Sequence, residues 1–203
     1  MYRDIEDFQQ NYPTKEARET ALKAMSNEEI DELIDLCQTV QGKNWYQGFK
    51  KPETIFRYEL KNAWCMPLCR LEVIDGPETL VSFETDAFKE RLERYPGTGE
   101  FTEEIRLSRV DLMRIRDILD DDRLFETEEL EDPYGMMILD GYIQEFGISG
   151  KGRHIDANGY NIQACKGDTE HCFRSDLMIR TLEEIGKILI PLGVPEQCFF
   201  LVR

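Results

Sequence analysis

The chain has 203 residues, of which 41% are hydrophobic and 33% are charged. This length can bury a hydrophobic core without disulfides or metals, and eleven Phe and eight Tyr residues favour an ordered one. The formal net charge of −16 argues against direct binding to a nucleic-acid backbone or an anionic membrane, because both would repel the protein. The same charge fits general solubility, or a basic protein partner.

The sequence has no apolar run near the roughly 18 residues that a membrane span needs. The first ten residues show no basic stretch followed by an apolar one, so no secretory signal is predicted. We therefore expect a cytoplasmic protein. Its six cysteines are then expected to be free thiols.

Two helices are predicted near the N-terminus, after a loosely docked lead-in over residues 1–13. Residues 14–25 have a good helix composition, with Thr14 as the N-cap. Ser26 and Glu29 fit a capping box that opens a second helix. This helix carries apolar residues at helical spacing and ends at a glycine: Ile30, Leu33, Ile34, Cys37, Val40 and Gly42.

A loop over residues 43–53 interleaves aromatic residues with lysines. Such a pattern can stack nucleic-acid bases or phosphosugars. One short basic island lacks the extended basic surface that such binding requires. The sequence therefore favours Trp45 and Phe49 in the core, with Lys43, Lys50 and Lys51 in solvent.

Strands are predicted in two groups. The first comprises residues 54–60, 68–74, 79–84 and 101–107. The second is a meander of four strands over residues 134–164, with turns at Asp140-Gly141, 149–152 and Asn158-Gly159. Alternation puts Ile155 and Ala157 on a core face and His154 and Asp156 on a solvent face.

Further helices are predicted over residues 85–95, 108–120 and 176–190, the last capped by Ser175 or Asp176. These patterns predict an α+β fold, with antiparallel β meanders covered by helices and an N-terminal helical pair. Residues 1–53 are expected to form a helical segment and loop, and residues 54–203 an α+β domain. In an alternative arrangement, that domain would consist of two packed halves, residues 54–121 and 122–203.

The acidic segment, residues 117–132, contains nine acidic residues and only one basic residue. Such a run is normally a solvated helix end and loop. Because it is dense and lies between two predicted elements, it is also the candidate surface for a basic partner. The predicted partner-binding residues are Asp117, Asp120, Asp121, Asp122, Glu126, Glu128, Glu129, Glu131 and Asp132.

No catalytic residue, metal site or cofactor is predicted. Cys65 and Cys69 have a zinc-ligand spacing but lack a second pair at matching spacing. His171 adjoins Cys172, yet sequence neighbours rarely form the hydrogen bond that activates a thiol. The glycine-rich run at residues 147–152 lacks the P-loop spacing and leads into a strand.

The sequence therefore favours an acidic interaction protein that binds a basic protein, for example as an inhibitory, immunity-like protein. One alternative is a small enzyme whose active site lies in a cleft between the two strand groups. Another is an oligomerising structural module that uses edge strands or the apolar residues 199–201. The partner and the oligomeric state are left open.

Overall fold

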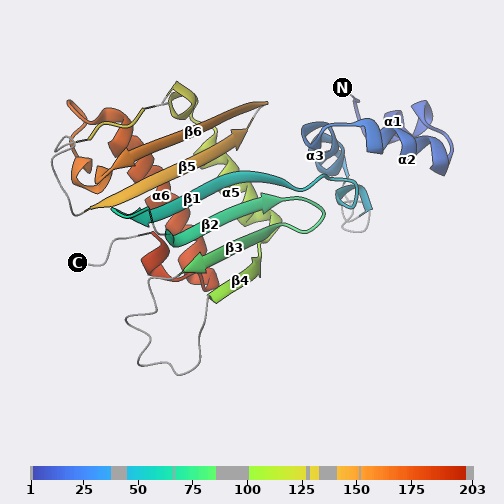
Figure 1. Ribbon diagram of the computed structural model, residues 1–203. Helices are drawn as coiled ribbons and strands as arrows, with labels where there is room; N and C mark the ends of the chain where they lie inside the picture. Colours follow the sequence, from blue (N-terminus) through green and yellow to red (C-terminus); the bar gives the residue numbers. More distant parts are fainter. Residues whose placement is uncertain are drawn as a thin grey trace. The chain divides into compact units, whose positions relative to one another are not determined.

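A computed structural model describes residues 2–37, 45–65, 67–85, 101–126, 129–132, 141–150 and 152–199. The chain forms two compact units (Figure 1). We call residues 1–53 with 75–78 the helical unit, and residues 54–74 with 79–203 the sheet unit. The predicted α+β fold class is confirmed. Among the described residues, no helix has the length and apolar character that a membrane crossing needs.

The helical unit contains α1 (Ile5–Asn11), α2 (Lys15–Ala24) and α3 (Asn27–Leu36). Each helix begins after a residue whose side chain accepts a backbone hydrogen bond from three residues on: Asp4, Thr14 and Ser26. The predicted Thr14 cap and Ser26–Glu29 capping box are thus confirmed. The helix ends at Leu36, with Cys37 extended, so it is shorter than the predicted helix, whose end at Gly42 lies outside the described residues.

The core of the helical unit is aromatic and aliphatic. The prediction that residues 1–13 are loosely docked is wrong, because Phe8 on α1 is completely buried. Tyr46 is also buried, and its ring meets that of Phe8 edge-on, with the ring centroids 6.0 Å apart. Trp45 and Phe49 pack against this core while remaining partly exposed. The prediction that Trp45 and Phe49 contribute to the core is therefore confirmed.

The sheet unit is built on one six-stranded antiparallel sheet in the order β4-β3-β2-β1-β5-β6. Its strands are β1 (Glu53–Asn62), β2 (Pro67–Asp75), β3 (Leu80–Thr85), β4 (Phe101–Arg106), β5 (Tyr142–Gly150) and β6 (Arg153–Tyr160). Because β5 pairs with β1, with Tyr58 opposite Phe146, strands of both predicted groups belong to one continuous sheet. The last strand predicted in the meander is wrong, because a 3-10 helix forms at Ile162–Cys165. The division into halves 54–121 and 122–203 remains a prediction.

Two helices cover one face of this sheet, as Figure 1 shows: α5 (Arg109–Leu119) and α6 (Phe173–Leu189). They bury an apolar layer with the inward residues of the strands, including Phe56, Tyr58, Leu71, Phe83, Phe146 and Ile148. Past α6 the chain forms two short 3-10 helices, Ile190–Leu192 and Glu196–Cys198. Phe199 then packs on Gly186, where a Cβ would come within 3.0 Å of its ring. Gly186 thus leaves room for that ring.

The β5–β6 hairpin corrects part of the predicted meander. Gly150 pairs with Arg153, so the chain reverses within the turn expected at residues 149–152, and Gly152 has a φ of +69°. The predicted turn at Asn158-Gly159 is wrong, because β6 continues through both residues and Gly159 pairs with Gln144. A Cβ on Gly159 would lie 2.4 Å from Ile162 Cγ2, so the glycine serves close packing. The predicted strand before Asp140 lies outside the described residues, as does the helix predicted over 85–95.

The start of α6 also differs from the prediction. The helix begins at Phe173, so Ser175 and Asp176 are buried in its first turn instead of capping it. The residue before the helix, Cys172, makes no side-chain cap hydrogen bond. A helix N-terminus needs acceptors for its first N–H groups, so the acceptor must come from another part of the chain.

Candidate functional site

The acidic segment surrounds the C-terminus of α5 and a 3-10 helix, η2 (Asp122–Glu126). Five of its predicted partner-binding residues are exposed: Asp117, Asp120, Asp122, Glu126 and Glu129. Asp121, Glu131 and Asp132 are partly buried. Glu128 lies outside the described residues. Binding of a partner by these residues remains a prediction.

Two carboxylates of the acidic segment, Asp121 and Asp122, pair with arginines of the same unit. Asp121 accepts hydrogen bonds from Arg123 Nε at 2.9 Å and from its backbone N–H at 3.0 Å, and the Arg123 side chain lowers the pKa of Asp121 despite partial burial. Asp122 pairs with Arg153, whose guanidinium lies 4.2 Å over the Phe125 ring. Because these groups are largely exposed, each pair contributes at most about 1 kcal/mol.

Glu131 supplies the acceptor that α6 needs. Its carboxylate accepts from the Ser175 backbone N–H at 2.8 Å, from Ser175 Oγ at 3.0 Å and from the Arg174 backbone N–H at 3.3 Å. Partial burial acts to raise the pKa of Glu131, but these hydrogen bonds outweigh it, so the pKa lies below its usual range. Glu131 is therefore a structural member of the acidic segment.

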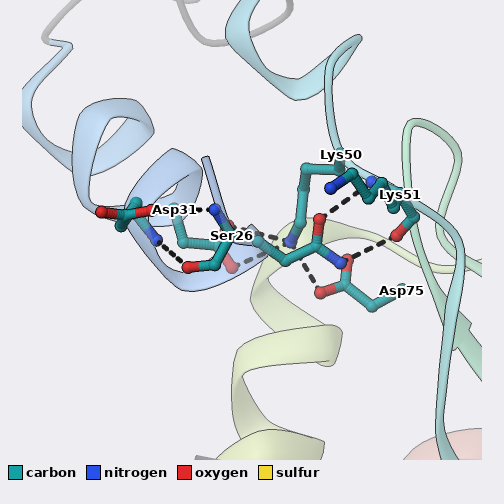
Figure 2. Close-up of polar contacts among 7 residues, drawn as sticks. Ser26, Asp31, Lys50, Lys51 and Asp75 are labelled. Carbon is teal, nitrogen blue, oxygen red and sulfur yellow. Dashed lines mark hydrogen bonds and ion pairs between the residues drawn. The ribbon is translucent and has the colours of Figure 1, made fainter. Parts of the chain in front are cut away.

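A second cluster of charges is buried in the helical unit (Figure 2). Lys50 Nζ contacts Asp31 Oδ2 at 2.8 Å and Asp75 Oδ2 at 2.6 Å, and the exposed side-chain fractions of Lys50 and Asp75 are 1% and 0%. Beside it, the Asn27 side chain makes two 2.8 Å hydrogen bonds to the Lys51 backbone. Lys50 is thus enclosed by carboxylates and inaccessible to a ligand.

The prediction that the lysines of residues 43–53 are solvated is therefore wrong for Lys50. Burying an ammonium group is tolerated because two carboxylates surround it. Its partners lie 19 and 25 residues away in the sequence, so no local pattern indicates the cluster. Lys51 follows the prediction, since its side chain is exposed.

The face of the sheet opposite α5 and α6 carries charged residues in cross-strand pairs. Arg57 on β1 contacts Asp156 on β6 at 2.8 Å, and Lys61 contacts Glu145 on β5 at 2.7 Å. On β6, Asp156 is exposed whereas Ala157 is buried. The predicted alternation of this strand is thereby confirmed.

His154 connects two neighbours on this charged face. Its Nδ1 lies 2.8 Å from Ser149 Oγ and its Nε2 lies 3.0 Å from Asp156 Oδ2. A Ser–His–Asp order of contacts can activate a serine nucleophile. Here, however, the His154 side chain is 59% exposed, and Asp156 also pairs with Arg57. The sequence did not indicate Ser149, because the β5–β6 register was needed to pair it with His154.

Two of the buried cysteines, Cys69 and Cys165, have raised thiol pKa values. Burial and a hydrogen bond with Cys172 raise the pKa of Cys165 to about 12. A hydrogen bond with Cys198, together with burial, raises the pKa of Cys69. Such thiols are poor nucleophiles because the thiolate is disfavoured. Within the described ranges, no three His, Cys, Asp or Glu residues are grouped to hold a metal ion.

Comparison with known proteins gives no relative for this chain. No family model, curated protein or solved structure matches it.

Replacing Lys50 with Met should lower the free energy of unfolding by about 3 kcal/mol, because the buried Asp75 and the partly buried Asp31 lose the ammonium group between them. Urea unfolding followed by circular dichroism measures the change. Lys51→Met, at an exposed position, is the matched control and should change it by less than about 0.5 kcal/mol. Adding Asp31→Asn and Asp75→Asn to Lys50→Met should restore part of the loss. Equal effects of the two lysine changes would contradict a buried ion cluster.

Replacing Glu131 with Gln should lower the free energy of unfolding by about 1 kcal/mol at pH 7, because α6 loses a charged cap. The folded-state pKa of Glu131 is below its ordinary 4.5, so this stabilisation is present above that value. It is lost as the pH falls through the lower folded-state pKa. The difference between wild type and variant should therefore shrink on acidification.

Urea unfolding at a series of pH values tests this expectation. The matched control is Glu126→Gln, which removes an exposed carboxylate from the same segment. It should cost less than about 0.5 kcal/mol at any pH. A Glu131 effect that stays constant down to acidic pH would rule out the charge as its cause.

Proposed function

We propose that this protein acts in the cytoplasm as a non-enzymatic interaction protein that binds a basic protein partner. The observation that carries the proposal is the acidic segment, which keeps Asp117, Asp120, Glu126 and Glu129 exposed in a chain of net charge −16. Carboxylates in such a cluster attract a basic surface over several ångströms and raise its association rate.

Contacts within the sheet unit balance part of the negative charge of the acidic segment. Arg123 and Arg153 compensate Asp121 and Asp122, and the α6 N-terminus compensates Glu131. The acidic segment itself contains no basic residue besides Arg123. A partner rich in Lys and Arg would complete the balance across an interface.

Inhibition is one form that such binding can take. A basic enzyme that acts on nucleic acid presents a positively charged active site to a polyanion. A protein surface of clustered carboxylates can occupy the same site, as an immunity-like protein would. This supports a toxin or nuclease as the class of partner, and it requires no catalytic residue in the inhibitor.

The test is affinity capture on the immobilised full-length chain from lysate of its native host, eluted with a salt gradient. A basic protein should be retained at low salt and released as salt increases, because screening weakens exposed charge pairs. With the identified partner, neutralising Asp117, Asp120, Glu126 and Glu129 to their amides should weaken binding by about tenfold or more.

A matched variant separates the acidic segment from net charge alone. It neutralises four exposed carboxylates elsewhere on the sheet unit: Glu103, Glu104, Glu170 and Glu196. Binding should then weaken by less than about threefold, because the interface is intact and only the long-range field changes. Equal losses in both variants, or capture insensitive to salt, would refute the acidic segment as the binding surface.

Hydrolysis at Ser149 is a second candidate, supported by one observation, the Ser149–His154–Asp156 order of contacts. If it holds, a fluorophosphonate probe should label Ser149, and Ser149→Ala and His154→Ala should each abolish the labelling. Mass spectrometry of the labelled chain identifies the modified residue. Absence of labelling on the folded protein would eliminate this candidate.

A further inference from the structure

The helical unit has a groove of about 700 Å³ along α2, which we call the α2 groove. Three small residues of α2 line it: Ala17, Ala21 and Ala24. Their spacing of four and three residues puts them on one face of the helix. Small side chains in such a row let another helix approach closely.

The tyrosines Tyr2 and Tyr12 form an apolar wall of the α2 groove. Their hydroxyls lie 3.4 Å apart, and their rings meet edge-on with centroids 6.5 Å apart. The buried Phe8 ring supports both of them, at centroid distances of 5.1 and 5.2 Å. This wall is therefore held in place before anything binds.

The charged residues that line the α2 groove are both acidic. Glu16 lies in the first turn of α2 and Glu29 in the first turn of α3, and both are exposed. The hydrogen bond with Tyr12, burial and the carboxylates of Glu29 and Asp7 raise the pKa of Tyr2 to about 12. The groove thus combines apolar lining residues with a negative electrostatic potential.

We propose that the α2 groove binds an amphipathic basic helix of a partner protein. Apolar side chains of that helix lie over Ala21 beside the tyrosines, and its Lys or Arg residues pair with Glu16 and Glu29. The inference rests on the proposed function and names the segment of the basic partner that is bound. The ten residues of α2 span about 15 Å, which matches about three turns of a partner helix.

The charge pattern favours this occupant over a purely apolar one. A purely apolar helix would offer no positive charge to the two carboxylates. A lysine at the edge of the apolar face of a partner helix can reach them, because its long side chain extends along that face. The tyrosine faces offer the same lysine a cation–π contact. A helix is favoured over an extended strand because the groove is lined by a row of small side chains on a helix, which suits helix packing.

The experiment titrates the full-length protein into a fluorescent peptide of about 14 residues, with leucines at helical spacing and lysines on the flanking positions. A second peptide has the same composition and charge, but its leucines alternate as in a strand. The helical peptide should bind more tightly by about tenfold. Equal affinity for both peptides would overturn the proposal, because charge alone would then explain the binding.

A pair of charge-reversed variants localises the binding. Glu16→Lys changes a residue of the α2 groove, and Glu32→Lys changes an exposed glutamate of α3 outside it by the same net charge. Glu16→Lys should weaken binding by about tenfold and Glu32→Lys by less than about threefold. Equal losses would overturn the groove as the site.

Thr20→Trp provides a steric test at an exposed position of the α2 groove. It should abolish binding of the helical peptide without reversing a charge. Sedimentation of the wild type tests the competing occupant. A dimer that Thr20→Trp dissociates would assign the groove to a second copy of the chain and overturn the proposal.

Failure of the groove and failure of the proposed function can be told apart. If neither peptide binds, the groove proposal is wrong. Salt-sensitive capture of a basic protein that depends on Asp117, Asp120, Glu126 and Glu129 would still support the proposed function. Loss of that capture as well would refute both.

Discussion

The sheet unit depends on covering the apolar face of two of its inner strands, β1 and β5. Phe56 and Tyr58 on β1 and Phe146 on β5 are almost completely buried, in the same core as α6. Burial of side chains of this size contributes about 1.5–3 kcal/mol each, so α6 must hold its place for the sheet to be stable. Its N-terminus has no cap of its own and takes Glu131 instead. One carboxylate of the acidic segment is thus committed to the fold.

Most of the secondary structure could be predicted because its signals are local. The Thr14 cap, the Ser26–Glu29 capping box and the alternation of Ile155 and Ala157 each depend on residues within a few positions of one another. Glycine was the exception. Asn158-Gly159 has turn chemistry, but the packing of Ile162 and Leu130 on Gly159 keeps it inside a strand.

The candidate sites were less predictable because they depend on distant residues. The acidic segment could be identified from composition, but composition does not separate Glu131, which caps α6, from exposed Glu126 and Glu129. The local sequence around Lys50 is that of a surface lysine, and only folding brings Asp31 and Asp75 into contact with it. The α2 groove was missed for the same reason, since Tyr2 and Glu29 meet only once the helices have packed.

Glu131 and Asp122 tie the acidic segment to the fold at two points, α6 and β6 respectively. A flexible polyacidic tail would lose backbone and side-chain freedom on association, at about 0.5–1.5 kcal/mol for each immobilised side chain. Because the segment is tethered at two points, much of this conformational freedom is already lost when the chain folds. For the partner binding that we propose, this tethering would favour discrimination among basic surfaces by shape as well as by charge.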